Sequence, residues 1–508
     1  MRNMKRRTWL YVLLFLVIPT VAIAQDEASA SGGSFLEGIN ASFAWFVNNI
    51  IFGILFFDAG TGFPFIVLWL IAGAIFFTFR MQFVNIRAFK HAIDVVRGKY
   101  DDPEEEGEVS HFQALATALS ATVGLGNIAG VAIAVSVGGP GAVLWMTVGG
   151  IFGMTSKFVE CTLGQKYRVV KPDGTVSGGP MRYLSRGLAE LGQRKLGQVL
   201  AAVFSVLCIF GAFGGANMFQ ANQSYGAVAQ IVPIPGWLYG VILATLVGLV
   251  IIGGVERIGQ VAGAIVPLMC TFYVLASLFI ILTNMAQIPN AISVIISGAF
   301  NPQAIEGGIL GVIVQGLRRS AFSNEAGIGS AAIAHSAART EEPIREGIVA
   351  LLEPFIDTIV VCNMTALVLV ITGAYNDPAY EDLRASGAGA ELTSAAFGSA
   401  ISWFPVLLAI AVFLFAFSTM ISWGYYGERC WDYLSGGRGL IIYKILFLLA
   451  TFIGSIAAPG PVIDFSDGML LAMALPNLLG AYFLSNIVAR DLKSYLSRLK
   501  SGEMVPVQ

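Results

Sequence analysis

The stretch Ser120-Ala-Thr-Val-Gly-Leu-Gly-Asn127, in the middle of an apolar segment, decides the fold. Glycines, hydroxyls and an amide at the centre of a hydrophobic span disfavour a continuous helix, since each glycine costs about 1 kcal/mol relative to alanine in a helix interior. Non-helical backbone at membrane depth is tolerated only where protein buries it or where it lines a cavity. A broken span of this kind indicates the binding site of a membrane carrier.

The composition agrees with a membrane protein. The 508 residues are 56% hydrophobic and only 12% charged, whereas soluble domains are near 25% charged. The five cysteines are expected in spans or on the cytoplasmic side, which argues against a disulfide framework. The histidines show no metal-ligand spacing; they are His91, His111 and His335.

Residues 1–24 have the layout of a secretory signal peptide. Basic residues precede the apolar run Trp9–Ala24, which ends in the small-residue motif Ala22-Ile23-Ala24 before Gln25. The alternative is an uncleaved signal anchor. In both cases residue 25 emerges on the outer side of the membrane.

Apolar runs long enough to cross a bilayer, about 20 residues each, predict eleven spans. They lie near 62–79, 112–135, 140–164, 199–230, 236–254, 259–284, 305–335, 344–373, 394–425, 440–458 and 468–489. The segment Phe35–Phe57 is also apolar but carries three asparagines and precedes Asp58. We interpret it as an interfacial helix on the outer face.

The distribution of lysine and arginine sets the orientation, because positively charged loops stay in the cytoplasm. Eleven spans that start outside place the basic residues of 80–99, 166–195 and the tail after 490 in the cytoplasm. Only Arg384, in the acidic loop Tyr375–Leu392, is then outside. The sequence predicts a mature amino terminus outside and a carboxyl terminus inside.

The ten spans after the first divide into two sets of five, and each set begins with an interrupted span. Because five is odd, the two sets run through the bilayer in opposite directions, as in the inverted repeats of many secondary transporters. The prediction is an all-α polytopic protein with a 5+5 inverted repeat and one extra amino-terminal span. Its expected parts are a signal peptide (1–24), a periplasmic segment with a peripheral first span (25–80), a cytoplasmic loop (81–110), the repeats (111–285 and 301–489) and a cytoplasmic tail (490–508).

The first break predicts a polar site near the midplane. Interruption at Val123–Gly126 frees backbone amides, which favour a carboxylate, and carbonyls, which coordinate a cation such as sodium. Ser120, Thr122 and Asn127 add side-chain oxygens. The alternative is that Gly124 and Gly126 only permit close helix packing.

The second break, Arg318 to Gly329, places Ser323 and Glu325 beside glycines. A carboxylate at membrane depth is a functional hypothesis by default. The alternative for Glu325 is a structural ion pair with Arg318 or Arg319.

Two further spans carry polar residues that could complete the site. Gln220 and Gln223 can share one helix face, where they line a cavity or bond neighbouring helices. Ser418 and Thr419 could complete a sodium site, although such hydroxyls also bond back to their own helix. Space for a substrate side chain is expected between Phe322, Met420 and Trp423.

Three longer motifs resemble one known family. The segments Gly138–Gly153, Phe322–His335 and Gly178-Gly-Pro-Met181 are similar to the signatures of the alanine or glycine:cation (sodium:alanine) symporters, with departures at Leu144 and Thr147. The resemblance covers roughly residues 45–490. It implies a leucine-transporter-type fold and cotransport of a small neutral amino acid, alanine or glycine, with sodium.

The resemblance also implies individual roles. A sodium site would use Asn127 near the substrate, and a second would lie between Ser120, Val123, Ser418 and Thr419. The substrate would contact Gly124, Gly126, Asn127, Gln220 or Gln223, Ser323 and Trp423, with Met420 as a wall.

Three classes of function compete. Neutral oxygens at the breaks favour a sodium-coupled symporter in the bacterial cytoplasmic membrane. A proton-coupled amino-acid carrier using Glu325 is the alternative. A membrane enzyme or channel would need a catalytic cluster or a filter motif, and neither is present in the sequence. The expected partners are sodium, a small amino acid and the lipid bilayer, with no nucleic acid.

Overall fold

The computed structural model describes residues 62–171, 175–301 and 308–504, a few positions between 49 and 60, and Pro506. The described chain is helical apart from one antiparallel hairpin of β1 (Val169–Val170) and β2 (Val176–Ser177). The predicted signal peptide 1–24 lies outside the described residues. So does the interfacial helix predicted at Phe35–Phe57, except for a few positions that include the short helix α3 (Gly53–Leu55).

The helices of the first half follow the predicted spans. They are α4 (Phe65–Arg80), α7 (His111–Thr122) with the π-helical turn η2 (Gly126–Gly130) and α8 (Val131–Gly138), α9 (Ala142–Lys166), α11 (Arg194–Phe213) with η3 (Gly214–Met218) and α12 (Phe219–Ala229), α13 (Gly236–Ile251) and α14 (Gly254–Thr283). Shorter helices connect them: α5 (Val84–Arg87), α6 (Phe89–Val96) and α10 (Pro180–Glu190).

The second half begins after η4 (Met285–Gln287) and α15 (Ile288–Ala299). Its long elements are α16 (Gly308–Asn324) with α17 (Ala331–His335), α18 (Pro343–Ala350) continued by α19 (Leu352–Pro354), η5 (Phe355–Cys362) and α20 (Asn363–Ile371), then α23 (Phe404–Ser435), α24 (Leu440–Ile456), α25 (Pro459–Ala472) and α26 (Ala474–Ser501). The connection before α23 contains η6 (Pro378–Tyr380), α21 (Glu381–Ala385) and α22 (Gly389–Ala400).

Six helical stretches of the described chain are long and apolar enough to cross a membrane, and the bent pair of α7 and α8 makes a seventh. The expected spans at α4, α13 and α24 form apolar helices of only 16 or 17 residues. The multi-pass architecture is therefore present, while the count of eleven stays a prediction. The expected spans 394–425 and 468–489 are shifted, because α23 begins at Phe404 and the last helical stretch already begins at Pro459.

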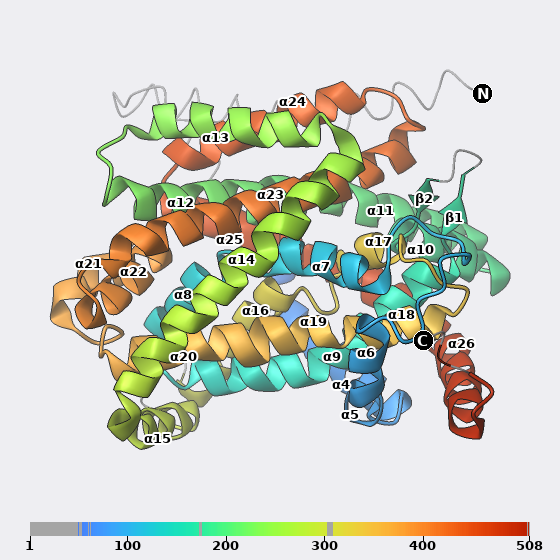
Figure 1. Ribbon diagram of the computed structural model, residues 1–508, viewed down its shortest axis with the longest axis horizontal. Coiled ribbons are helices and arrows are strands. Elements are labelled where there is room, and N and C mark those ends of the chain that lie inside the picture. The colour runs from blue at the N-terminus through green and yellow to red at the C-terminus, as the bar shows by residue number, and fades with distance from the viewer. Residues whose placement is uncertain are drawn as a thin grey trace.

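Helices at equivalent positions of the two sets pack against each other. α9 contacts α18, α19 and η5, α11 contacts α23, and α13 contacts α24. Figure 1 shows α13 and α24 side by side along one edge of the bundle, and α14 crossing the other helices obliquely. The division into two inverted sets of five spans stays a prediction.

The connecting segments collect at two ends of the bundle. In Figure 1, α15, α21 and α22 lie at one end, while β1, β2 and α10 lie at the other with the carboxyl end of the chain. This separation agrees with the loops that the charge distribution assigned to opposite sides of the membrane.

The orientation can be tested with single cysteines introduced as Lys99→Cys and Arg384→Cys. An impermeant thiol reagent added to intact cells is expected to label position 384 and not position 99. The native cysteines are buried or partly buried, so their background should be low. Labelling of position 99 from outside would contradict the predicted topology.

Candidate functional site

The first broken span begins with a capping box. The Ser110 hydroxyl accepts a hydrogen bond from the amide of Gln113, whose side chain accepts from the amide of Ser110. The helix then ends at Thr122, Val123 leaves the helical conformation, and the chain resumes at Gly126 after a bend of 54°. The predicted interruption at Val123–Gly126 is therefore present.

Both glycines of the break lie where neighbouring helices approach closely. A Cβ at Gly124 would lie 2.3 Å from Oγ1 of Thr419, and one at Gly126 would lie 3.3 Å from Cα of Ser323. The glycines thus let α23 and the end of α16 pack directly against the interrupted backbone. The sequence left open whether these glycines interrupt the helix or permit close helix packing. In the structure they do both.

The second break has an unusual backbone. After α16 ends at Asn324, Glu325 has a φ of 56°, and Gly327 and Gly329 have φ of 90° and 92°. Left-handed conformations are uncommon for residues other than glycine, asparagine and aspartate, and such strain clusters at functional sites. The surrounding packing must hold Glu325 in place.

Asp357, in the π-helical segment η5, joins the two breaks. Its carboxylate accepts from Nδ2 of Asn127 at 2.6 Å and from Oγ of Ser323 at 2.9 Å, and Thr358 donates to it at 2.7 Å. All four side chains are buried. Carboxylate, hydroxyl and amide oxygens are ligands that hard cations prefer.

Sequence reasoning missed Asp357. The signal was available, because an aspartate within the span 344–373 is an ionisable residue at membrane depth. Its partner Asn127 lies 230 residues away in sequence, so no local pattern indicated what the carboxylate would contact.

The residues predicted for a second sodium site lie where α7 packs against α23. The hydroxyl of Ser120 donates to the carbonyl of Ser418 at 3.2 Å, and Thr419 donates to the carbonyl of Ser120 at 3.4 Å. The Ser418 hydroxyl instead bonds back to Phe415, while Ser422 donates to Oγ of Ser120 at 2.8 Å. Val123 is fully buried at the adjacent break.

A small cavity lies between the two breaks. It has a volume of about 10 Å³, enough for about one water molecule, so the helices are closely packed around it in this conformation. Its lining comes from five parts of the chain: Ala121, Thr122, Gly126, Gly215, Ala216, Gln220, Phe322, Glu325, Thr419, Trp423 and Leu470.

Of the predicted substrate residues, Gly126, Gln220 and Trp423 line this cavity. Gln220 also holds the first break, because its Oε1 accepts from the amide of Leu125 at 3.1 Å. Gly124 lies immediately behind, against Thr419 and Gln220.

Gln223 and Met420 do not line the cavity. Gln223 donates to the carbonyl of Gly387 at 3.3 Å and accepts from the amide of Ala390, so it connects α12 to the segment around α22. Met420 is fully buried elsewhere in the core, and Leu470 lines the cavity instead.

Glu325 is hydrogen-bonded to neutral groups. Trp423 Nε1 donates to its Oε1 at 2.9 Å, and Ser330 donates to its other oxygen. The arginines that were alternative partners for it both contact Asp467 of α25, Arg318 at 2.5 Å and Arg319 more closely. These ion pairs connect α16 to α25. On each helix they lie about one turn from a cavity residue, Phe322 on α16 and Leu470 on α25.

A second buried cluster of charges supports the second break. Lys157 pairs with Glu353 at 3.0 Å, and Nε2 of His335 lies 3.6 Å from the same carboxylate. His335 and His111 both hydrogen-bond Glu346. All of these side chains are fully buried, so His111 and His335 are members of a buried network of charged groups.

Two interrupted helices that meet around a buried polar cavity in a multi-pass helical bundle define a secondary transporter. The chain belongs to the Sodium:alanine symporter family, which it matches over residues 49–508. The family and the characterised relatives are transporters and not enzymes.

Three relatives show the extent of the similarity. The sodium/alanine symporter AgcS of Methanococcus maripaludis is 42% identical over 433 residues, 85% of this chain and 94% of AgcS. From Bacillus subtilis, the amino-acid carrier protein AlsT is 35% identical, over 88% of this chain and 94% of AlsT. The probable sodium/glutamine symporter GlnT, also from Bacillus subtilis, is 35% identical, over 86% of this chain and 89% of GlnT.

Proposed function

We propose that this protein imports alanine or glycine together with sodium by alternating access across the bacterial cytoplasmic membrane. The proposal rests on one observation. The carboxylate of Asp357 accepts hydrogen bonds from Asn127 of one broken span and from Ser323 of the other. Family membership and the name of AgcS support the same coupling. The proposed architecture is a leucine-transporter-type 5+5 inverted repeat with eleven spans, the amino terminus outside and the carboxyl terminus inside.

Two sodium ions are proposed as co-transported substrates. One takes oxygens from Asn127, Ser323 and Asp357, and the other takes oxygens from Ser120, Val123, Ser418 and Thr419. The substrate carboxylate lies at Gly124–Gly126, where amides at the start of a half-helix favour an anion. Opening of the small cavity between Gln220, Phe322 and Trp423 admits the rest of the molecule.

The proposal is tested by uptake of radiolabelled alanine into proteoliposomes. An inward sodium gradient is expected to drive accumulation above the equilibrium level, and an equal potassium gradient is not. Equal accumulation of alanine with and without the sodium gradient would contradict the proposal.

A proton-coupled carrier is the second candidate. It is favoured by one observation: the Glu325 carboxylate lines the cavity in a left-handed backbone conformation. In the same proteoliposomes, accumulation driven by a proton gradient without sodium, and lost in Glu325→Gln, would support this candidate over the first.

Thr419→Ala is expected to raise the sodium concentration for half-maximal uptake by about tenfold. Loss of one oxygen at a buried polar site costs about 1–2 kcal/mol, and 1.4 kcal/mol is tenfold in affinity. Thr419→Ser keeps the hydroxyl and is the matched control. An unchanged sodium dependence in folded Thr419→Ala would place the second sodium elsewhere.

Glycine and alanine are expected to compete for uptake, and leucine and phenylalanine are expected to compete at least tenfold more weakly. Overpacking the defined space beside Phe322, Trp423 and Leu470 costs about 1–3 kcal/mol. Leu470→Ala is expected to admit valine and leucine. Met420→Ala, which removes a side chain that does not line the cavity, is the control.

Competition assays should include glutamine, because the related protein GlnT is named a probable sodium/glutamine symporter. Strong competition by leucine or glutamine in the unmodified protein would contradict selection by size in this cavity.

A further inference from the structure

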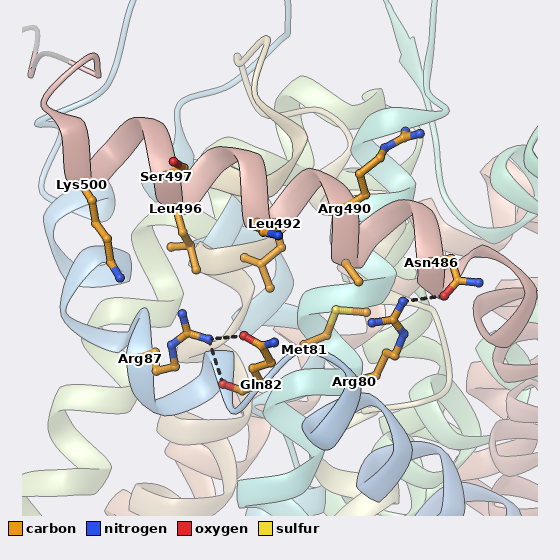
Figure 2. A pocket seen from close by; sticks show the side chains of 12 residues that line it. Arg80, Met81, Gln82, Arg87, Asn486, Arg490, Leu492, Leu496, Ser497 and Lys500 are labelled. Carbon is orange, nitrogen blue, oxygen red and sulfur yellow. Dashed lines mark hydrogen bonds between the residues drawn. The ribbon is translucent and has the colours of Figure 1, made fainter.

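A basic groove lies outside the transport site, between the turn after α4 and the end of α26 (Figure 2). Its volume is about 620 Å³, and its lining includes Arg80, Arg87, Lys493 and Lys500. In Figure 2 the side chains of Arg87 and Lys500 point toward each other across the groove, and Arg490 of α26 also contributes to its lining. The groove therefore concentrates positive charge from two separate elements.

Asp491, the acidic residue next to Arg490 of the groove lining, is already paired with other residues. Asp491 pairs with Lys166 at 2.8 Å and with Arg490 at 3.2 Å. Arg80 and Arg87 donate only to neutral acceptors in the described part of the chain, Asn486 for the first and Gln82 for the second. None of the described residues that line the groove is acidic, and positive charge of this kind favours an anionic ligand.

Apolar side chains are also exposed on α4, on α5 and in the turn between them, the segment that supplies Arg80 and Arg87 to the groove. Phe76, Phe79, Phe83 and Ile86 are exposed, with Phe79 at 63% and Ile86 at 70%. Residues of this kind on a membrane helix contact acyl chains, and basic residues at the end of the helix lie at the level of the lipid headgroups. A soluble phosphate would make no use of this surface.

We propose that the groove binds an anionic phospholipid of the surrounding bilayer. Its phosphate lies between Arg87 and Lys500, within reach of Arg80, and its acyl chains lie on the exposed apolar side chains of α4 and α5. Basic pockets at the ends of membrane helices bind diphosphate lipids such as cardiolipin, so a lipid with two phosphates is expected to bind more tightly than one with a single phosphate.

The experiment is native mass spectrometry of the full-length protein in detergent, titrated with cardiolipin, phosphatidylglycerol or phosphatidylethanolamine. Cardiolipin is expected to bind most tightly and phosphatidylethanolamine least. The double variant Arg87→Gln and Lys500→Gln is expected to bind cardiolipin about 30-fold more weakly, because each basic residue contributes about 1 kcal/mol at an anionic headgroup.

Three further arms make the test decisive. Arg438→Gln, which removes an exposed basic side chain between α23 and α24 that does not line the groove, is expected to leave binding within about twofold of the unmodified protein, since exposed charges far from the lipid are screened. The double variant Arg87→Lys and Lys500→Arg keeps both charges and is expected to retain binding, which separates charge loss from misfolding. Phe79→Ala is expected to weaken cardiolipin binding.

Equal losses in Arg438→Gln and in the double glutamine variant would overturn the proposal, because they would show a general charge effect. Displacement of bound cardiolipin by millimolar inorganic phosphate would also overturn it, since the groove would then recognise phosphate and not a lipid.

Discussion

Asp357→Asn is expected to abolish sodium-dependent uptake at ordinary sodium concentrations. The substitution keeps the size of the side chain but removes the only charge among the oxygens of Asn127, Ser323 and Asp357. Two unit charges 4 Å apart interact by about 4 kcal/mol at an effective dielectric constant of 20, so the apparent sodium affinity should fall by about a thousandfold. The measurement is the sodium dependence of alanine uptake in proteoliposomes.

The matched control is Asp377→Asn. Asp377 is an exposed aspartate whose carboxylate accepts from the amide of Ala379 in the loop before α21, so its removal should leave the sodium dependence unchanged. A folded Asp357→Asn protein with normal sodium dependence would show that the carboxylate joins the two breaks without binding the ion.

Lys157→Met is expected to destabilise the protein by about 3–5 kcal/mol. The substitution leaves the Glu353 carboxylate buried without its ammonium partner, and breaking a buried ion pair by removing one member costs this much. The measurement is the denaturant dependence of unfolding in lipid-supplemented detergent. Alanine uptake by Lys157→Met is also expected to fall, because His335 of the same cluster lies in the helix that follows the second break.

Lys99→Met is the matched control, because Lys99 pairs with Asp94 at 2.5 Å on an exposed surface. Exposed pairs are worth about 0–1 kcal/mol. The double variant Lys157→Met and Glu353→Gln removes both charges and is expected to recover part of the loss. A loss in Lys157→Met no larger than in Lys99→Met would contradict the structural role of the buried pair.

The positions of both interrupted helices were predictable from the sequence because glycine acts locally. Gly124 and Gly126 disfavour helix wherever they lie, and Gly327 and Gly329 permit backbone conformations that other residues resist. The apolar runs likewise predicted where long helices form, since hydrophobic length is a property of a contiguous segment. Family motifs then identified the class of transporter, which the family match confirmed.

Which side chains meet at the site was decided only by tertiary packing. Gln220 and Gln223 lie within one turn of the same helix, yet the first reaches the break and the second reaches the segment around α22. Trp423 lines the cavity while Met420, three residues earlier, does not. A helical period limits which residues share a face, but the rotation of each helix follows from the neighbours it packs against.

Asp357 shows the same limit most clearly. Its span was predicted, but its partners Asn127 and Ser323 lie 230 and 34 residues away. Contacts across such separations exist only after the helices have packed, since no local pattern of residues encodes them. The sequence by itself therefore determined where the helices break and what class of protein they form, and the tertiary structure decided which carboxylate joins the breaks.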